Sequence, residues 1–326
     1  MERIRASMDA TTLQASRIPL KTRFEEEVEQ YWGNNWGATT EVGKLRMVLL
    51  HRPGDEIETV KPPLEKWKYP VMPDLEKMQE EHNGLAEALK KEGVKVVYRA
   101  LGDPRLVMSI YTRDPSMPAK GGMIIGRMFD ALRRGEEKPT AKTYANLGVP
   151  ILRTIHGTGF LEGGGFMWLD EKHVLIGLSK RINEEGIRQA EDVLKVGGVE
   201  EVLGVPILNL SGHIDACFNM IDVHKAAIIR EAFPPYPPKY SILRYLEESL
   251  KFQLIEFPEE LFDGGSVVIE PGKIMIKAEC EEARKLLEKE GLDVIEVDLT
   301  ELTIPNNIGS LHCLTCPIIR DPEPSF

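Results

Sequence analysis

Apolar positions along the chain follow two alternating patterns, continuous runs of strand length and stripes at helical spacing. Residues 45–50 (LRMVLL) and 94–98 (VKVVY) are short apolar runs bounded by turn signals, which is typical of buried strands. Between them, residues 73–92 have the spacing of an amphipathic helix, with one face made of Leu75, Met78, His82, Leu85 and Leu89. This order of elements predicts an α/β fold in which helices cover neighbouring strands.

The alternation continues further along the chain. Helices are predicted at residues 184–196, 240–252 and 281–290, and a strand at residues 205–210 (VPILNL). The first part of the chain differs, because residues 21–32 alone have helical spacing there and Gly33 ends that helix. We expect residues 1–36 to be an N-terminal extension and residues 37–326 to form a single domain.

Short clusters of glycine and polar residues recur at nearly constant spacing. The landmark residues of these clusters are Asp114, Glu162, His213, Gly264 and Cys313. The steps between them are 48, 51, 51 and 49 residues. Such a period predicts repeated units of strand, strand, helix and strand around an axis, with strand ends meeting at one central site. Sequence identity between the units is low, so the alternative is that the landmarks share their spacing by chance.

Two segments interrupt this repeat. Residues 127–147 (RMFDALRRGEEKPTAKTYANL) have the pattern of a charged helical insertion, and residues 233–240 (FPPYPPKY) that of a stiff proline-rich loop. Each segment is a candidate lid over a pocket. An ordinary surface connection is the alternative for both.

The composition limits the classes of partner. A formal net charge of −11 disfavours nucleic acid or an anionic membrane surface, and it mildly favours a cationic small molecule. The opening MERIRASMDATTLQASR has no apolar core of a secretory signal, and the apolar runs are far shorter than the roughly 20 residues of a membrane helix. Four cysteines in 326 residues are too few for a disulfide scaffold, so we expect a reduced, cytoplasmic protein.

The strongest candidate for chemistry is Cys313, in the segment GSLHCLTCP. A thiol is the best nucleophile available near neutral pH once a base or a lowered pKa yields the thiolate. Cys313 and Cys316 also form a C-x-x-C motif, which is compatible with a redox pair, half of a zinc site or a structural pair. The sequence has no second C-x-x-C, and Pro317 follows where a thioredoxin-type motif would begin a helix.

Three further clusters carry side chains suited to proton transfer or to binding a cation. His213 and Asp215 (SGHID) are two residues apart, which places both on one side of an extended segment. Glu162 begins an E-G-G-G run that permits close backbone approach, and Asp114 lies in YTRDP. The ordinary alternatives are a structural His–Asp hydrogen bond, a flexible connection after Glu162, and a surface ion pair between Arg113 and Asp114.

Together these residues are suited to attack on a guanidinium group. Two carboxylates can hold a planar guanidinium by parallel N–H bonds and keep it protonated, so that its carbon stays electrophilic. Cys313 would add to that carbon, His213 would protonate the departing nitrogen, and a third carboxylate would orient the imidazole. The sequence contains no G-x-x-x-x-G-K-[ST] or G-x-G-x-x-G motif and no metal-ligand spacing, so we expect neither a cofactor nor a metal.

Five motifs, in the order YTRDP, LEGGGF, GLSKR, GHIDACF and GSLHCLTCP, resemble those of the guanidino-group modifying enzymes. This superfamily includes arginine deiminase, dimethylarginine dimethylaminohydrolase, agmatine deiminase and the amidinotransferases. The resemblance extends over residues 43–322 and implies a five-bladed pseudo-symmetric α/β propeller, the pentein fold. By motif, Cys313 resembles the nucleophile of a covalent amidino intermediate, and Glu162 the partner of the catalytic His213. Asp114 and Asp215 resemble the aspartates that bind guanidinium nitrogens.

The resemblance also bears on the substrate. Arg181, in GLSKR, is similar to an arginine that helps bind the substrate carboxylate in arginine deiminases; an exposed side chain without a ligand is the alternative. Gly165 stands where arginine deiminases have the aspartate of E-G-G-D, and His312 precedes the cysteine as in agmatine deiminase. We therefore expect a hydrolase of arginine or an arginine derivative. An amidinotransferase and a non-catalytic binding propeller are the alternatives, and a homo-oligomer is left open.

Overall fold

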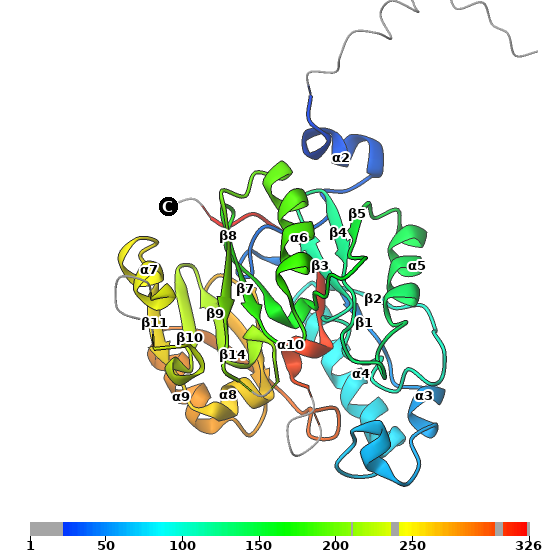
Figure 1. Cartoon of the computed structure of the whole chain (residues 1–326). Coiled ribbons are helices and arrows are strands. Elements are labelled where there is room, and N and C mark those ends of the chain that lie inside the picture. Colours follow the sequence, from blue (N-terminus) through cyan, green and yellow to red (C-terminus); the bar gives the residue numbers. More distant parts are fainter. Residues whose placement is uncertain (1–21, 210, 236–240, 304–308, 325–326) are drawn as a thin grey trace, which may run out of the picture.

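The strands form five separate three-stranded sheets arranged around a common axis (Figure 1). This computed structural model describes residues 22–209, 211–235, 241–303 and 309–324. In every sheet the middle strand, here called the second, pairs antiparallel with one neighbour, the first strand, and parallel with the other, the third strand. A helix connects the second strand to the third, since parallel neighbours need a crossover. The predicted unit of strand, strand, helix and strand is confirmed, and with it the five-bladed α/β propeller.

Four of the units are continuous in the chain. Their elements are β3 (Ser116–Ala119), β4 (Gly122–Ile125), α5 (Glu137–Leu147) and β5 (Ile151–Thr154); β6 (Phe166–Asp170), β7 (His173–Leu178), α6 (Glu184–Val196) and β8 (Glu201–Pro206); β9 (Phe218–Asp222), β10 (Lys225–Ile228), α7 (Ile242–Glu248) and β11 (Gln253–Glu256); and β12 (Ser266–Glu270), β13 (Lys273–Lys277), α9 (Glu281–Lys289) and β14 (Asp293–Val297). The helices predicted at 184–196 and 281–290 are thus confirmed, and that at 240–252 is shorter than predicted.

The fifth unit joins the two ends of the domain. It consists of β15 (Cys316–Arg320), β1 (Leu45–Leu50), α4 (Leu75–Lys91) and β2 (Lys95–Tyr98). Strand β15 pairs antiparallel with β1, with Cys316 opposite Leu49. The C-terminal strand therefore completes the first sheet and closes the ring. Four shorter helices lie between units: η2 (Gly163–Gly165), η3 (Ile214–Ala216), α8 (Glu259–Gly264) and α10 (Leu311–Leu314). Three more, α3 (Asp55–Glu58), η1 (Leu64–Trp67) and η4 (Arg230–Ala232), lie within units.

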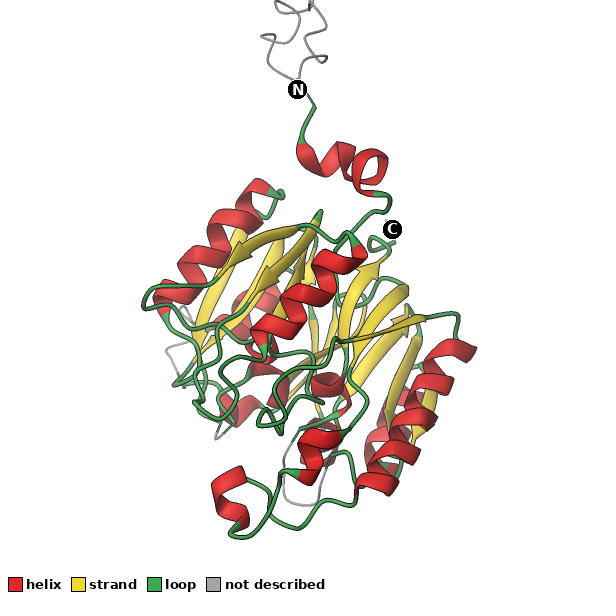
Figure 2. Cartoon of the chain, turned by 90° about the vertical axis from the view of Figure 1, so that its right-hand side faces the viewer, coloured by secondary structure: helices red, strands yellow, loops and turns green. Residues whose placement is uncertain are grey.

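The position of a strand within its sheet determines its burial. The middle strands are apolar runs buried along most of their length, because sheets of neighbouring units and helices cover them. The third strands β2, β5 and β11 share one pattern, with half-buried centres and exposed ends. The long helices lie on the outside of the ring, as Figure 2 shows. These units therefore share a burial pattern although their sequences are only weakly similar.

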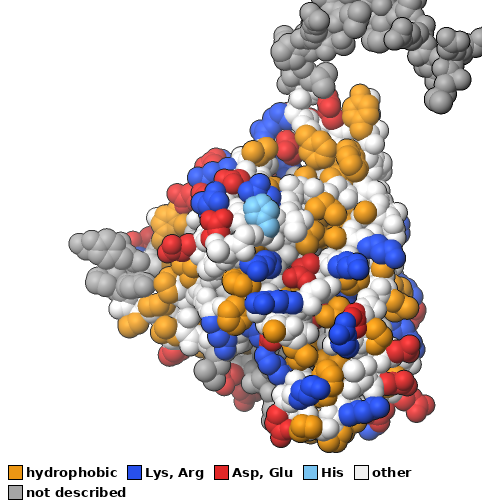
Figure 3. Space-filling model, turned by 45° about the vertical axis from the view of Figure 1, so that its right-hand side comes forward, with side chains coloured by type: hydrophobic (Ala, Val, Ile, Leu, Met, Phe, Trp, Pro, Cys, Tyr) orange, Lys and Arg blue, Asp and Glu red, His pale blue; other side chains and the backbone are white. Residues whose placement is uncertain are grey.

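Helix α2 (Phe24–Trp32) lies outside the ring (Figure 2). Val28 and Trp36 are buried and attach this segment to β1 and β4. Phe24, Tyr31 and Trp32 remain exposed, and Figure 3 shows apolar side chains gathered at this end of the molecule. The helix predicted at 21–32 is confirmed. The domain boundary at residue 36 stays a prediction.

Two expectations were wrong. The strand predicted at 205–210 is instead β8 (Glu201–Pro206), which ends at Pro206. It pairs in parallel with β7, and the last residue of β7, Leu178, lies opposite Pro206. Leu210 is outside the described residues. Residues 127–147 are not an insertion, since they contain α5, the regular crossover helix of its unit. Of the proline-rich loop at 233–240, residues 236–240 lie outside the described part of the chain.

Candidate active site

The predicted landmark residues come together at one end of the ring. Each precedes the first strand of its sheet: Asp114 before β3, Glu162 before β6, His213 before β9, Gly264 before β12 and Cys313 before β15. We expected them where strands end, and they lie instead where the innermost strands begin. The pseudo-symmetry of the ring brings these strand starts to a common centre.

At the fourth sheet, a glycine makes room for the loop that carries the thiol. Gly265 has a φ of +68°, in the left-handed region that favours glycine. A Cβ at this position would lie 2.6 Å from Ser310 Oγ and 3.0 Å from the backbone nitrogen of His312. Since α10 contains Cys313, this close approach sets the position of the candidate nucleophile against β12.

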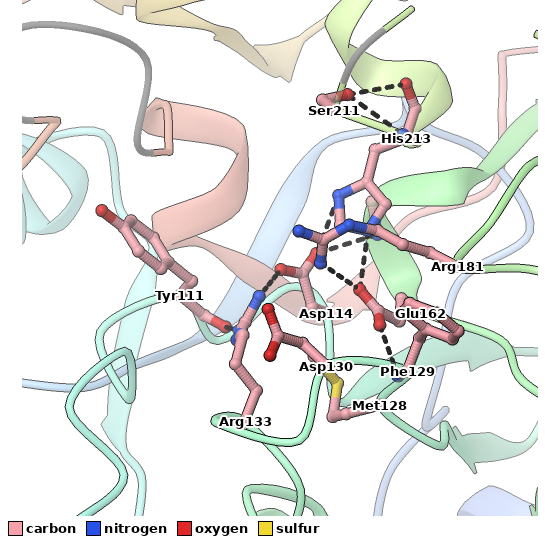
Figure 4. A network of polar contacts seen from close by, with 12 residues as sticks. Tyr111, Asp114, Met128, Phe129, Asp130, Arg133, Glu162, Arg181, Ser211 and His213 are labelled. Atoms are coloured by element: carbon pink, nitrogen blue, oxygen red, sulfur yellow. Dashed lines mark hydrogen bonds and ion pairs between the residues drawn. The ribbon is translucent and has the colours of Figure 1, made fainter. Parts of the chain in front are cut away.

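A buried imidazole is held between two carboxylates (Figure 4). His213 Nε2 lies 2.8 Å from Glu162 Oε2, and His213 Nδ1 lies 3.7 Å from Asp114 Oδ1. The backbone amide of Gly164 donates to Asp114 Oδ1 at 3.1 Å, and that of Phe129 donates to Glu162 Oε1 at 2.7 Å. These contacts fix the orientation of both carboxylates and, through them, that of the ring.

Two arginines approach the same carboxylates from different segments (Figure 4). Arg181 Nη1 donates to Glu162 Oε2 at 3.0 Å, with about a fifth of its side chain exposed. Arg133 Nη1 donates to Asp114 Oδ2 at 2.5 Å, and Arg133 is itself held by two bonds to Glu136. Arg133 and Glu136 are buried. Sequence reasoning missed Arg133, because the charges of residues 127–147 resembled a solvated surface; the adjacent arginines and glutamates were the signal.

The candidate nucleophile belongs to a second group of contacts. Ser310 caps α10, with its Oγ 3.4 Å from both the nitrogen and the Sγ of Cys313. Cys313 Sγ lies 3.9 Å from Asp215 Oδ2. The same oxygen accepts a hydrogen bond from Nδ1 of the buried His312 at 2.8 Å. His312 drew attention in the sequence as a family marker, but its bond to Asp215 was not foreseen.

The electrostatic surroundings of the imidazole and of the thiol are opposite in effect. Burial disfavours the charged form of His213, but Asp114, the Glu162 hydrogen bond and Asp215 together raise its pKa. Burial raises the pKa of the Cys313 thiol, and the negative charges of Asp215 and Asp114 raise it further. Asp114 itself has a pKa lowered to about 2, because His213 and Arg133 outweigh its burial. These surroundings thus favour the charged form of the imidazole and the protonated form of the thiol.

The structure decides several of the alternatives that the sequence left open. The segment from His213 to Asp215 is not extended, because η3 begins at Ile214; Asp215 therefore contacts Cys313 rather than the Glu162–His213 pair. Arg113 and Asp114 are both buried, and Arg113 pairs with Glu41 instead of forming a surface ion pair. The basis of the predicted His213–Asp215 arrangement was wrong, although both residues reach the site.

The two cysteines of the C-x-x-C motif lie in different surroundings. Both are free thiols. Cys316 is buried, and its Sγ lies 3.5 Å from Ser116 Oγ and 3.6 Å from the Tyr144 hydroxyl. It packs with the core around β4, whereas Cys313 packs against the core around α4 and β12. Cys316 therefore contacts Ser116 and Tyr144, whereas the contacts of Cys313 are with Ser310 and Asp215.

Asp114, Glu162 and His213 also have the residue types of a metal site. One atom from each lies within 4.8 Å of the others. Arg133 and Arg181 already bring positive charge to the two carboxylates.

Among the described residues, no helix has the length and apolar character needed to cross a membrane.

Comparison with known proteins gives a consistent family of relatives. The model of the family described as N,N dimethylarginine dimethylhydrolase, eukaryotic, matches residues 65–320. The protein named YkgA of Bacillus subtilis (strain 168) is 29% identical over 287 residues, covering 86% of this chain and 94% of that protein. The arginine deiminase of Limosilactobacillus reuteri (strain DSM 20016) is 25% identical over 402 residues, covering 87% of this chain and 97% of the enzyme.

A solved structure has the same fold. It is a Cys-to-Ser mutant of the DDAH from Pseudomonas aeruginosa, complexed with citrulline. The two chains align with a TM-score of 0.68 and 22% sequence identity, over 84% of this chain and 99% of that one. The likeness extends over nearly the whole propeller.

Proposed function

This chain belongs to the family described as N,N dimethylarginine dimethylhydrolase, eukaryotic, within the pentein superfamily of guanidino-group modifying enzymes, and we propose that it hydrolyses a guanidinium C–N bond of arginine or an arginine derivative. The observation that carries the proposal is the convergence of a thiol, an imidazole and two aspartates from three different units. Cys313 Sγ lies 3.9 Å from Asp215, and His213 lies 2.8 Å from Glu162 and 3.7 Å from Asp114.

The aspartates are the proposed receptors of the substrate cation. A guanidinium between Asp215 and Asp114 would donate hydrogen bonds to both carboxylates, and their negative charge would keep it planar and protonated. Arg133 contacts the carboxylate of Asp114 and not that of Asp215. Asp215 is therefore the stronger candidate for the bidentate contact, with Asp114 as the second.

Binding of a cation would also activate the nucleophile. The pKa of Cys313 is raised by burial and then by Asp215 and Asp114, which favours the protonated thiol in the absence of substrate. A guanidinium placed between those aspartates offsets their charge and stabilises a thiolate beside it, and the proton of the thiol is released to solvent. The thiolate then forms a C–S bond to the guanidinium carbon. Activation in this scheme depends on the charge of the substrate.

His213 is the proposed proton carrier of both steps. In the first, it protonates the nitrogen whose bond to carbon breaks, and ammonia or an alkylamine departs. In the second, it takes a proton from water, which attacks the same carbon as the C–S bond breaks, leaving a ureido product and the thiol. The hydrogen bond that His213 donates to Glu162 holds the ring and favours its charged form. Arg181 is proposed to bind the carboxylate of an amino-acid substrate.

The test is a panel of substrates read by mass spectrometry. Purified protein is incubated with N,N-dimethylarginine, arginine, agmatine and guanidino acids, and both products and intact protein are weighed. We expect a ureido product from one of them, and an amidino adduct that peptide mapping assigns to Cys313. Cys313→Ala should abolish both, with a loss of at least about 10⁴-fold in rate. Cys316→Ser, three residues away, is the matched control and should retain the adduct.

Other outcomes identify the alternatives. An adduct on Cys313 that clears only after addition of glycine, lysine or ornithine would make the protein an amidinotransferase, because the same intermediate then passes to an amine. No product and no adduct with any guanidino compound would contradict the enzyme proposal and favour a binding propeller. Full activity in Cys313→Ala would exclude the covalent mechanism.

A further inference from the structure

A small polar cavity lies on the axis of the propeller, behind the candidate active site. All five sheets contribute to its lining through their innermost strands or the residues beside them. The polar lining residues are Glu41, Arg113, Asn219, Ser266, His312 and Arg320. The cavity has room for about one water-sized species. It shares His312 with the site, but it belongs to none of the steps described above.

The lining carries more positive than negative charge. Arg113 and Arg320 are 1% and 5% exposed, and the carboxylate among the lining residues is that of Glu41, also 5% exposed. Arg113 Nη1 contacts Glu41 Oε1 at a long 3.4 Å. Burial lowers the pKa of Arg320 to about 10, and Glu41 only partly offsets this. A buried net charge of this kind is costly unless a counterion neutralises it.

The same residues have hydrogen-bond donors to spare. Arg113 Nε donates to the carbonyl of Thr315 at 3.0 Å, and Arg320 Nη1 donates to that of Gly43 at 2.7 Å. Within the described part of the chain, Arg113 Nη2, Arg320 Nε and Ser266 Oγ have no hydrogen-bond partner. Buried polar groups without partners are rare in proteins and point to a ligand, a water or an ion.

We propose that this axial cavity is a chloride site. Chloride is an acceptor without hydrogens, so it matches three donors and brings the missing negative charge. A water molecule would satisfy some of the donors but would leave the excess charge of Arg113 and Arg320 unchanged. Phosphate and sulfate are too large for a cavity of this size. The site would bind one halide ion between Arg113, Arg320 and Ser266.

The location gives the ion a structural role next to the chemistry. His312 lines the cavity and donates to Asp215, whose Oδ2 lies 3.9 Å from Cys313 Sγ. Arg320 belongs to β15, which begins three residues after the thiol. Chloride would therefore hold together the sheets on which the site is built. The inference does not depend on the proposed reaction, because it concerns residues outside the substrate contacts.

The first test is crystallographic. Crystals of the full chain, grown without chloride, are transferred to bromide, and anomalous differences are collected at the bromine edge. We expect a peak within hydrogen-bond distance of Arg113 Nη2, Arg320 Nε and Ser266 Oγ. Absence of a peak there, with water density in its place, would overturn the proposal.

A second test measures the same site in solution. Chloride replaces gluconate at constant ionic strength, and thermal unfolding is followed. We expect Tm to rise by about 2 °C or more as the site fills, with bromide acting like chloride and sulfate having no such effect. Ser266→Ala removes one donor and should weaken the apparent chloride affinity about tenfold.

The matched control is Ser109→Ala, since Ser109 is as buried as Ser266, at 3% exposed, and lies outside the cavity. This variant should keep the chloride dependence of the parent. Equal chloride dependence in Ser266→Ala and Ser109→Ala, or no dependence in the parent chain, would contradict the site whatever the protein's activity proves to be.

Discussion

The imidazole side and the thiol side of the site are built from similar residues, but the charges of their carboxylates are neutralised to different extents. On the imidazole side, His213 lies between Glu162 and Asp114, and each carboxylate also meets an arginine. On the thiol side, Cys313 faces the carboxylate of Asp215, and the partners of that carboxylate are His312 and the thiol itself. The first side is neutralised by the protein's own cations, whereas the second lacks such an arginine among the contacts described.

The difference explains how one site can hold a reactive cysteine without exposing a permanent thiolate. The charges around His213 favour its protonated form in advance, and those around Cys313 favour the neutral thiol. A cationic substrate supplies the charge that the thiol side lacks. Selectivity for guanidinium and activation of the nucleophile then have the same physical origin.

Removal of the imidazole should break the first side and have the largest effect. His213→Ala is expected to lower kcat by about 10² to 10⁴, because proton transfer to the leaving nitrogen and from water is lost. The adduct on Cys313, once formed, should persist. His173→Ala is a control, since His173 also pairs with a carboxylate, Asp170, at 2.8 Å. Rapid turnover in His213→Ala would show that the imidazole is not the proton carrier.

Neutralising the aspartate beside the thiol should move two measurements in opposite directions. Asp215→Asn removes a charge that raises the pKa of Cys313, so the thiol pKa falls. Alkylation of the substrate-free enzyme by iodoacetamide should become about tenfold faster, since one pKa unit changes the thiolate fraction tenfold. Meanwhile kcat/KM should fall by about 10² or more, because the guanidinium loses a charged partner.

Asp130→Asn is the control for this prediction, because Asp130 lies near the site and pairs with Lys68 rather than with the thiol. It should leave the alkylation rate unchanged. If Asp215→Asn slowed alkylation, or left kcat/KM intact, the division into a preset side and a substrate-dependent side would be wrong.

The two arginines of the imidazole side should separate by stability. Arg133→Gln breaks a buried network with Asp114 and Glu136 and is expected to cost about 3–5 kcal/mol of unfolding free energy. Arg181→Gln, at a partly exposed ion pair with Glu162, should cost about 1 kcal/mol and act mainly through a higher KM. Urea unfolding and substrate titration measure both. Equal losses of stability would contradict the assignment of Arg133 to the buried framework.

The smallest effect is expected at the second cysteine. Cys316→Ser replaces a buried thiol that already neighbours the hydroxyls of Ser116 and Tyr144, so the new hydroxyl finds a partner. We expect a loss of about 1 kcal/mol in stability and less than about threefold in kcat. Loss of activity without unfolding would restore a functional link between the two cysteines.

Much of the fold could be predicted because its signals are local. Strand β1 at Leu45–Leu50 and helix α6 at Glu184–Val196 have the predicted bounds, since periodicity and end signals within each segment determine them. The end of β8 could not be predicted in this way, because the length of its partner β7 sets it. A strand's extent is a property of its pairing, which one segment does not contain.

The site residues separate in the same way, into those that a local motif identifies and those whose role depends on contacts in space. Residue types that carry chemistry, such as Cys313 and His213, were recognisable from their motifs and spacing. Arg133 was not, because its burial comes from Asp114, Tyr111 and Glu136 meeting in space. The contact of Asp215 with the thiol was also missed, since a single turn of η3 after His213 directs it there. The roles of these residues stay predictions until the variants are measured.

The joint between β1 and β15 has a consequence for how the protein is made. The bond from Arg320 to the carbonyl of Gly43 joins residues 277 positions apart. Cys313 lies in the loop that leads into β15, so its surroundings are assembled only when the last strand has paired with the first. Contacts of such sequence separation form late in folding. A nascent chain on the ribosome would thus carry four finished blades and no assembled catalytic centre, and completion of the ring would coincide with the appearance of activity.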